Sequence, residues 1–478
     1  MEKNGGDVKS GNKNFCIDWK WIVVIGACLA RVVTTGTVVF MGVFLDDIKS
    51  SLENVSTFQL SLVFGFGTGF LEGLGFLFAF LIKKFEGRYL VFVGALLAFA
   101  GVLVSSWTTN YVLLLIGLGI FNGVGQAAAR FILPVVVGHM FGEKDRHVGL
   151  SITNAGDGVG GVLAPILLSA LIDTMTWRRA MLIAAAFVLN LCFSAATIPL
   201  GIFVKKSPKK SGKNIVENEQ LEEIDSKSQN DVENASDSST SESEAPAAHS
   251  VKLFPNILFF YSNIILHSAG YFLFMTFIYS EMKETRIDSS TVSRIVSLIG
   301  GVSIVGRLSV SLMKGNSCVP RWLTYAVCHV IRGFSVLATL WAPDDVQSKV
   351  VWHSVICSIY GLTDGVTGAL IPVVCLDLFG LKRFADVLGY EMLIMGSGAF
   401  LGVPLGGVMK DLFASYEVSF IFSACSFILA GLVLFPLFFT RKDYQFSSKK
   451  GVDSKASRKS NDDGGVSLVK MKAKNFDE

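Results

Sequence analysis

Charged residues are scarce in this sequence. They make up 17% of its 478 residues, whereas an ordinary soluble domain carries about 25%. The eight cysteines form no close C-x-x-C pair and the six histidines lack the spacing of metal ligands, so we predict neither a disulfide framework nor a metal site. A phosphate-binding loop and a nucleophile elbow are also missing, which argues against an enzyme and predicts no cofactor.

Long apolar runs take up most of the chain instead. Hydrophobic residues amount to 51%, and 38 residues are phenylalanine. A bilayer core about 30 Å thick requires roughly 20 apolar residues in a helix. The first run is longer than a signal-peptide core of roughly 7–15 residues, so we expect it to be retained. In all, the sequence predicts twelve membrane-spanning helices, at about residues 21–43, 57–82, 89–107, 111–137, 148–172, 179–203, 253–279, 291–313, 322–342, 351–378, 387–409 and 417–440.

A long polar segment interrupts this series once. Residues 205–252 are first rich in lysine and then acidic and rich in serine, a composition that cannot bury enough apolar surface to fold alone. We therefore predict an all-α polytopic membrane protein with two six-helix halves, residues 21–204 and 253–440. The linker 205–252 and the tail 441–478 are expected to be disordered, and residues 1–20 form a cytoplasmic N-terminal segment.

Lysine and arginine residues gather in alternate connections. With the N-terminus inside, the cytoplasmic segments hold most of the 42 basic residues, as the positive-inside rule requires. We therefore expect an integral protein of the plasma membrane whose termini and linker are cytoplasmic. The basic tail is then a topology signal and not a nucleic-acid site. The N-V-S pattern at Asn54 predicts glycosylation on the outer side, whereas Asn234 would be cytoplasmic and unused.

Seven charged residues lie deep within the predicted spans. A charge at the centre of a bilayer costs about 2.5–3.5 kcal/mol on insertion scales, and it usually faces protein or a water-filled cavity. These residues are therefore the candidates for function. They are the arginines Arg31, Arg130, Arg307 and Arg332 and the acids Glu72, Asp157 and Asp364.

Each of these charges also has a structural interpretation. Arg307 precedes Lys314 by seven residues, about 10 Å along a helix, and arginine can extend over that distance to the bilayer surface. Arg31 is too central for this, and its alternative is a buried pair with Asp157 or Glu72.

The remaining candidates stay open in the same way. Arg332 is the only charge within its span, which favours a role in helix packing, and for Arg130 both interpretations stand. Asp364 must be paired, protonated or solvated. Arg307 is its predicted partner, in either a structural salt bridge or a pair linked to gating or substrate.

Four of the spans contain segments rich in small residues. Such segments allow helices to pack closely, and glycine together with proline allows bending. Both halves contain such segments, which fits a carrier whose halves rock against each other better than it fits a rigid scaffold. The segments are residues 65–76, 117–129, 154–165 and 396–407.

Several motifs resemble the monocarboxylate transporter family of the major facilitator superfamily. The stretch DWKWIVVIGACLA at the first span is similar to the family's opening motif, with Asp18 and Trp21 matching in kind. FGEKDRHVGLSITNAGDGVG, residues 141–160, resembles the motif at the fifth span, with Lys144 and Arg146 in matching positions. WRRAMLIAAAFVLN, SLIGGVSIVGR, GLTDGVTGALIPVVCLDLFG and LGVPLGGVMKD resemble later family spans. This resemblance implies alternating access by two six-helix halves and small carboxylates as substrates.

The resemblance also assigns roles to individual residues. Arg307 matches the arginine that handles the carboxylate in the family, but the position of the family's aspartate is Ser303. The family's span-one lysine corresponds to about Val39. Because two parts of the proton machinery are missing, proton coupling of the family's kind is doubtful, and either Asp364 or Asp157 would have to supply the acid. Arg31 adds positive field, and the candidates for gating or coupling are Asp157, Glu72, Lys144 and Arg146.

We therefore expect a carrier of a monocarboxylate or related small organic anion that works by alternating access. Its expected partners are this substrate, the lipid bilayer and, as an open expectation, a single-span accessory subunit. The first alternative is a facilitative carrier of aromatic amino acids or similar zwitterions. The second is a membrane receptor or scaffold that transports nothing and recruits partners through the linker and tail.

Overall fold

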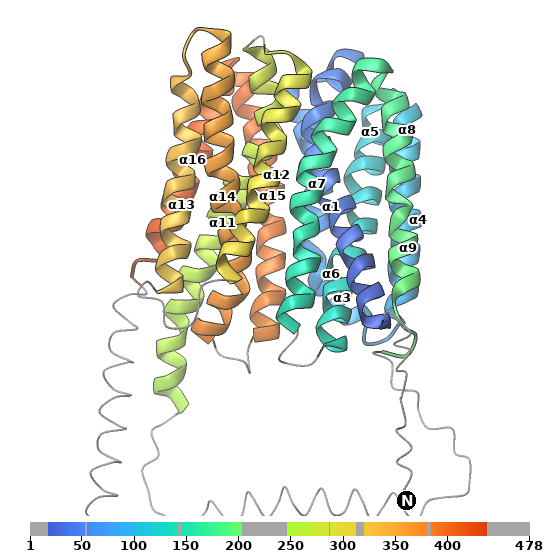
Figure 1. Ribbon diagram of the computed structural model, residues 1–478, viewed down its shortest axis with the longest axis vertical. Coiled ribbons are helices and arrows are strands. Elements are labelled where there is room, and N and C mark those ends of the chain that lie inside the picture. The colour runs from blue at the N-terminus through green and yellow to red at the C-terminus, as the bar shows by residue number, and fades with distance from the viewer. Residues whose placement is uncertain are drawn as a thin grey trace, which may run out of the picture.

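The computed structural model describes residues 18–52, 55–141, 146–202, 246–285, 287–311, 320–379 and 384–436. Every regular element in this part of the chain is a helix, and the helices stand side by side in one bundle (Figure 1). Asn54, Lys144, most of the predicted linker and the tail lie outside these residues, as does the side chain of Arg146.

The first half forms six spanning segments, three of which contain a break. Of the breaks, the bend between α2 and α3 measures 43°, and it directly follows Glu72 where two glycines flank Leu74. A π-helical stretch, η1, interrupts the fourth segment. In chain order the elements are α1 (Trp19–Ser51), α2 (Thr57–Gly73), α3 (Gly75–Leu81), α4 (Gly87–Trp107), α5 (Tyr111–Leu114), η1 (Leu115–Phe121), α6 (Asn122–Met140), α7 (Arg146–Thr174), α8 (Trp177–Val188) and α9 (Asn190–Thr197).

The second half also forms six spanning segments, and a short 3₁₀ turn, η2, follows α13. Its first helix begins at Pro246, before the boundary at 253 that the sequence predicts. Its elements are α11 (Pro246–Glu284), α12 (Ser289–Ser311), α13 (Arg321–Ala338), η2 (Thr339–Trp341), α14 (Val346–Phe379), α15 (Phe384–Phe413) and α16 (Glu417–Val433).

The described part of the chain thus forms twelve spanning segments. Ten are long and apolar enough to cross a membrane, the bent α2–α3 pair makes an eleventh, and α16 is a shorter apolar helix of 17 residues. The predicted twelve-helix architecture in two halves is thus confirmed. The first helix continues to Ser51, eight residues beyond its predicted end at 43, because an α-helix does not have to stop where the apolar run stops.

Two helix pairs make most of the contact between the halves: α2 with α15, and α7 with α12. Figure 1 shows α7 and α12 side by side along the middle of the bundle. Gly73 meets Gly396 in the first pair and Gly161 meets Gly300 in the second, with no room for a Cβ atom at Gly300 or Gly396. Glycine therefore brings the backbones of the two halves into direct contact, as small residues do in other membrane bundles.

A hydrogen-bonded cap joins the halves at the end of the bundle where α2 begins. The side chain of Asp411, in α15, accepts hydrogen bonds from the backbone N–H groups of Thr57 (3.1 Å) and Phe58 (2.8 Å). These are two of the first N–H groups of α2, which have no partner within their own helix. One half thus caps a helix of the other.

Candidate functional site

Five charged side chains from five helices meet between the two halves. Four of them belong to the first half and one, on α12, to the second. All are largely buried, with 4% to 18% of each side chain exposed. We call this group the arginine cluster; it consists of Arg31 (α1), Glu72 (α2), Arg130 (α6), Asp157 (α7) and Arg307 (α12).

Asp157 is the centre of the cluster. Its Oδ2 lies 3.1 Å from Nη1 of Arg307 and 3.5 Å from Nη1 of Arg31. Its Oδ1 lies 3.5 Å from Nη1 of Arg130 and accepts a hydrogen bond of 2.7 Å from the hydroxyl of Thr35. One carboxylate is therefore shared by three guanidinium groups, and none of these three contacts is as short as a strong charge-assisted hydrogen bond.

Arg130 and Glu72 form the tightest pair in the cluster. Nε of Arg130 donates to Oε2 of Glu72 and Nη2 lies beside Oε1, both at 2.7 Å. Two parallel bonds of this kind fix the guanidinium plane. Nη1 of the same arginine also donates to the hydroxyl of Thr34 at 3.4 Å. Glu72 is therefore the main partner of Arg130, whereas Asp157 is the carboxylate with which both Arg31 and Arg307 pair.

The cluster has one positive charge in excess, because three guanidinium groups face two carboxylates. Nε of Arg31 and Nε of Arg307 are also buried and have no hydrogen-bond partner in the described part of the chain. Buried charges are normally paired and buried donors normally bonded. The arrangement therefore has the charge and the free donors to hold one small anion.

The side chain of Arg307 binds residues of the other half and does not extend to the bilayer surface. Its Nη1 donates to the backbone carbonyl of Asn154 as well as to Asp157, both on α7. The guanidinium group therefore crosses from the second half to the first, and the surface-reaching alternative for this arginine is wrong.

Asp364 has a different partner from the one that the sequence predicts. Its Oδ1 lies 3.5 Å from Nη2 of Arg332, so the predicted pairing with Arg307 is wrong. The reason is the rotation of α14: Gly361 and Gly365 face α12, where they pack against its backbone. A residue next to Gly365 in the sequence is turned about 100° away from that contact.

Arg332 is fully buried and lies in a second cluster of polar side chains, within the second half. Nη1 lies 3.3 Å from Nδ1 of His267, and Nε donates to the hydroxyl of Thr363 at 3.5 Å. The guanidinium carbon lies 5.3 Å from the ring centres of both Tyr360 and Phe427, a cation–π distance. The helix-packing role expected for Arg332 agrees with these contacts.

Ser303 is buried, and within the described residues its side chain forms no hydrogen bond with the cluster. Its hydroxyl donates to the carbonyl of Gly300 in its own helix at 2.8 Å, and its backbone packs against Gly365. The monocarboxylate transporter family has an aspartate at this position, which in this chain is part of a helix-packing surface.

Two threonines that hydropathy and charge do not predict form hydrogen bonds with the cluster. Thr34 and Thr35 lie three and four residues after Arg31, a spacing that places side chains on one face of a helix. That spacing is the signal from which the two threonines could have been predicted.

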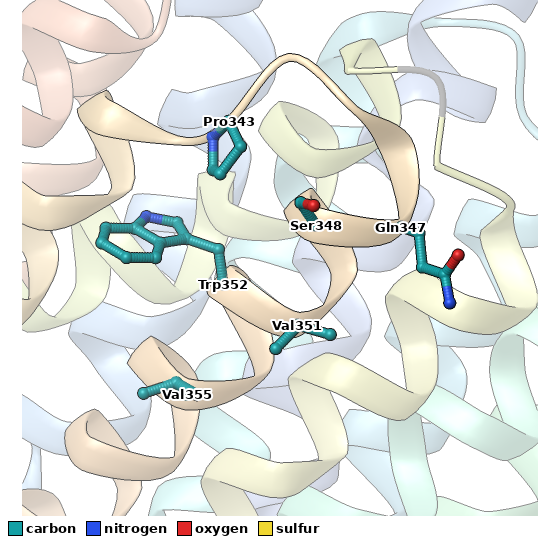
Figure 2. Close-up of a pocket in the computed structure, with 6 residues that line it drawn as sticks. All are labelled: Pro343, Gln347, Ser348, Val351, Trp352 and Val355. Carbon is teal, nitrogen blue, oxygen red and sulfur yellow. The ribbon is translucent and has the colours of Figure 1, made fainter.

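A hollow lies elsewhere, at the start of α14, and contains no charged residue (Figure 2). It is lined by Pro343, Gln347, Ser348, Val351, Trp352 and Val355.

Comparison with known proteins identifies the family of the chain. The model of the Major Facilitator Superfamily matches residues 21–390. The chain belongs to this superfamily. It is therefore a membrane transporter with an integral membrane fold. The predicted twelve-helix fold and the superfamily resemblance are both confirmed.

Individual relatives extend the resemblance. Monocarboxylate transporter 12-B of Danio rerio is 24% identical over 426 residues, 88% of this chain and 87% of that protein. Monocarboxylate transporter 1 of Bos taurus is 23% identical and covers 87% and 84%. The structure is similar to that of a D-xylose–proton symporter, with a TM-score of 0.66 at 13% identity over 87% of this chain and 98% of the other. At this identity the solved structure supports the fold alone.

Proposed function

We propose that this transporter carries a monocarboxylate or related small organic anion by alternating access. The observation that carries the proposal is the single excess positive charge of the arginine cluster, together with the free Nε groups of Arg31 and Arg307. One monoanion would neutralise that charge. The relatives named as monocarboxylate transporters support the same class of substrate.

The position of the cluster links binding to movement. Arg307 belongs to the second half, whereas Arg31 and Arg130 belong to the first. A carboxylate held by Arg307 and Arg31 together would draw the halves towards one another, and the glycine-lined interfaces let packed helices rock. The shared contacts of Asp157, at 3.1–3.5 Å, are long enough for a substrate carboxylate to compete for them.

Uptake measurements test this proposal. Cells that lack monocarboxylate uptake would express the wild type and Arg307→Ala and receive labelled lactate, pyruvate, longer carboxylates and aromatic amino acids. We expect saturable uptake of at least one monocarboxylate and its loss in Arg307→Ala at equal surface amount. Arg294→Ala is the matched control, because Arg294 lies on the same helix but is exposed. Equal uptake by both variants, or no anion uptake by the wild type, contradicts the proposal.

A zwitterion is the second candidate, and Asp364 favours it. This side chain is 16% exposed and has a single ion pair of 3.5 Å in the described structure. Tyr271 lies within electrostatic reach of Asp364 and also of Asp157 in the cluster. An aromatic amino acid would place its carboxylate at the arginines and its ammonium at Asp364. Asp364→Asn would then lower uptake of the amino acid and spare its analogue without the amino group.

We also propose that the protein lies in the plasma membrane with both termini in the cytoplasm. The distribution of lysine and arginine over the connections supports this orientation. Epitope tags at either terminus should be reached by antibody only after permeabilisation, and Asn54→Gln should lower the apparent mass if Asn54 carries a glycan. Staining of intact cells at either terminus would contradict the orientation.

A further inference from the structure

A sixth charged group lies beside the arginine cluster without belonging to it. Glu391, on α15, is only 5% exposed. The α2–α15 interface fixes its place, because Gly73 packs against Gly396 and Gly75 against the side chain of Met392. The carboxyl group is therefore next to the end of α2 that carries Glu72.

The groups that face Glu391 come from both halves. Glu72, Arg130 and Arg31 of the first half lie within electrostatic reach. From the second half Tyr325 (α13) and Cys375 (α14) approach it. Within the described part of the chain, the carboxyl group forms no hydrogen bond and no ion pair. Burial of an unpaired carboxylate is costly, and taking up a proton removes that cost.

The protonation state of this residue decides the total charge of the site. With Glu391 ionised, three arginines face three carboxylates and the group is neutral. With Glu391 protonated, the excess of one positive charge is restored. When Glu391 is ionised, a bound monoanion would give the site a net negative charge. When Glu391 is protonated, the monoanion would neutralise the site.

We propose that Glu391 is the proton-binding residue that couples transport of one anion to one proton. This inference rests on the proposed function. A proton from water on one side binds a carboxylate oxygen of Glu391, the anion then binds the arginines, and both leave on the other side. One proton and one monoanion cross together, so no net charge moves. Glu391 thereby takes over the role that Ser303 cannot perform.

Reconstituted protein tests the coupling with the wild type, Glu391→Gln and Glu391→Asp. For the wild type we expect uptake of the labelled anion to rise from pH 7.5 to pH 6, by up to about tenfold per pH unit. We also expect accumulation driven by a pH gradient, with proton and anion fluxes in a ratio of one to one. Glu391→Gln should abolish both the pH dependence and the accumulation but keep exchange of labelled for unlabelled anion. Glu391→Asp should restore the pH dependence.

The outcomes separate this inference from the proposed function. Glu417→Gln is the matched control, because it makes the same chemical change at an exposed position and should behave as the wild type. A wild type that carries the anion equally at both pH values, or a Glu391→Gln variant that still accumulates it along a pH gradient, overturns the assignment of Glu391 alone. A wild type that carries no anion overturns the proposed function and this inference with it.

Discussion

Arg307 and Asp157 form an ion pair that crosses between the two halves of the transporter, with Nη1 of the arginine 3.1 Å from Oδ2 of the aspartate. The same carboxylate also serves Arg31 and Arg130. A ligand that takes Arg307 from Asp157 would therefore change both the charge balance of the first half and its connection to the second.

Asp157→Asn should reduce transport strongly. The change leaves three guanidinium groups with Glu72 as the only carboxylate of the arginine cluster, and unpaired buried charges are strongly destabilising. We expect initial rates to fall by at least about tenfold, as for other residues that act as a unit. Adding Arg31→Gln returns the excess charge to one and should recover part of the thermal stability lost in Asp157→Asn, although transport stays low because Arg31 also binds the anion. A double variant no more stable than Asp157→Asn alone would show that charge balance is not the reason.

Arg332→Met should lower stability more than it changes substrate recognition. Arg332 is fully buried and pairs with Asp364, and removing one partner of a buried pair costs about 3–5 kcal/mol. Thermal unfolding in detergent would measure this loss, with the exposed Arg294→Met as control. Arg332→Met/Asp364→Asn should be more stable than Arg332→Met, and an unchanged melting temperature in the single variant contradicts the structural role.

Asp411→Asn should favour opening at the end of the bundle where α2 begins. The side chain caps Thr57 and Phe58 from the other half, with one N–H group on each carboxylate oxygen. Asparagine keeps one of these acceptors and turns the other into a donor, and a hydrogen bond to a charged group contributes about 1.5–3 kcal/mol. Ser61 is buried against Gly407 at this interface, so a cysteine at position 61 should react faster with a water-soluble thiol reagent in the Asp411→Asn background. Glu284→Gln is the control, because Glu284 pairs with Lys410 inside one half. Equal reaction rates in both backgrounds exclude a gating role for the cap.

Gly300→Ala should impair transport, whereas Gly138→Ala should not. A Cβ atom at Gly300 would collide with the backbone of α7, whereas nothing lies within 4 Å of a Cβ atom at Gly138. Overpacking typically costs about 1–3 kcal/mol, and here the strain falls on the interface that must move. Uptake per molecule at the cell surface measures the effect. Similar rates for the two variants would mean that the α7–α12 interface tolerates separation.

Hydropathy alone was sufficient to predict the fold. The twelve apolar runs each correspond to a spanning segment, because a bilayer requires about 20 apolar residues and allows few alternatives to a helix. Hydropathy could not predict the bend after Glu72 or the extension of α1 to Ser51, since both depend on local packing and caps.

The partners of the buried charges were harder to predict. Hydropathy identified Arg31, Arg307 and Asp157 as costly residues, and the structure places them together. Asp364 was assigned to the wrong arginine, because a sequence does not specify how α14 is rotated against α12 and α13. Glu391 is not among the seven deep charges that the sequence predicts, because it lies near the end of the predicted span 387–409 and hydropathy does not show how closely α15 packs on α2.

The most direct test of the anion site is ligand binding by the purified transporter. A monocarboxylate found in the uptake panel would be compared with its uncharged amide, using the wild type and Arg307→Gln, and thermal stabilisation at increasing ligand concentration would report affinity. We expect the carboxylate to stabilise the wild type, the amide to have no effect, and Arg307→Gln to lose the response to the carboxylate. Equal stabilisation by acid and amide, or an unchanged response in Arg307→Gln, would contradict an anion site at Arg307.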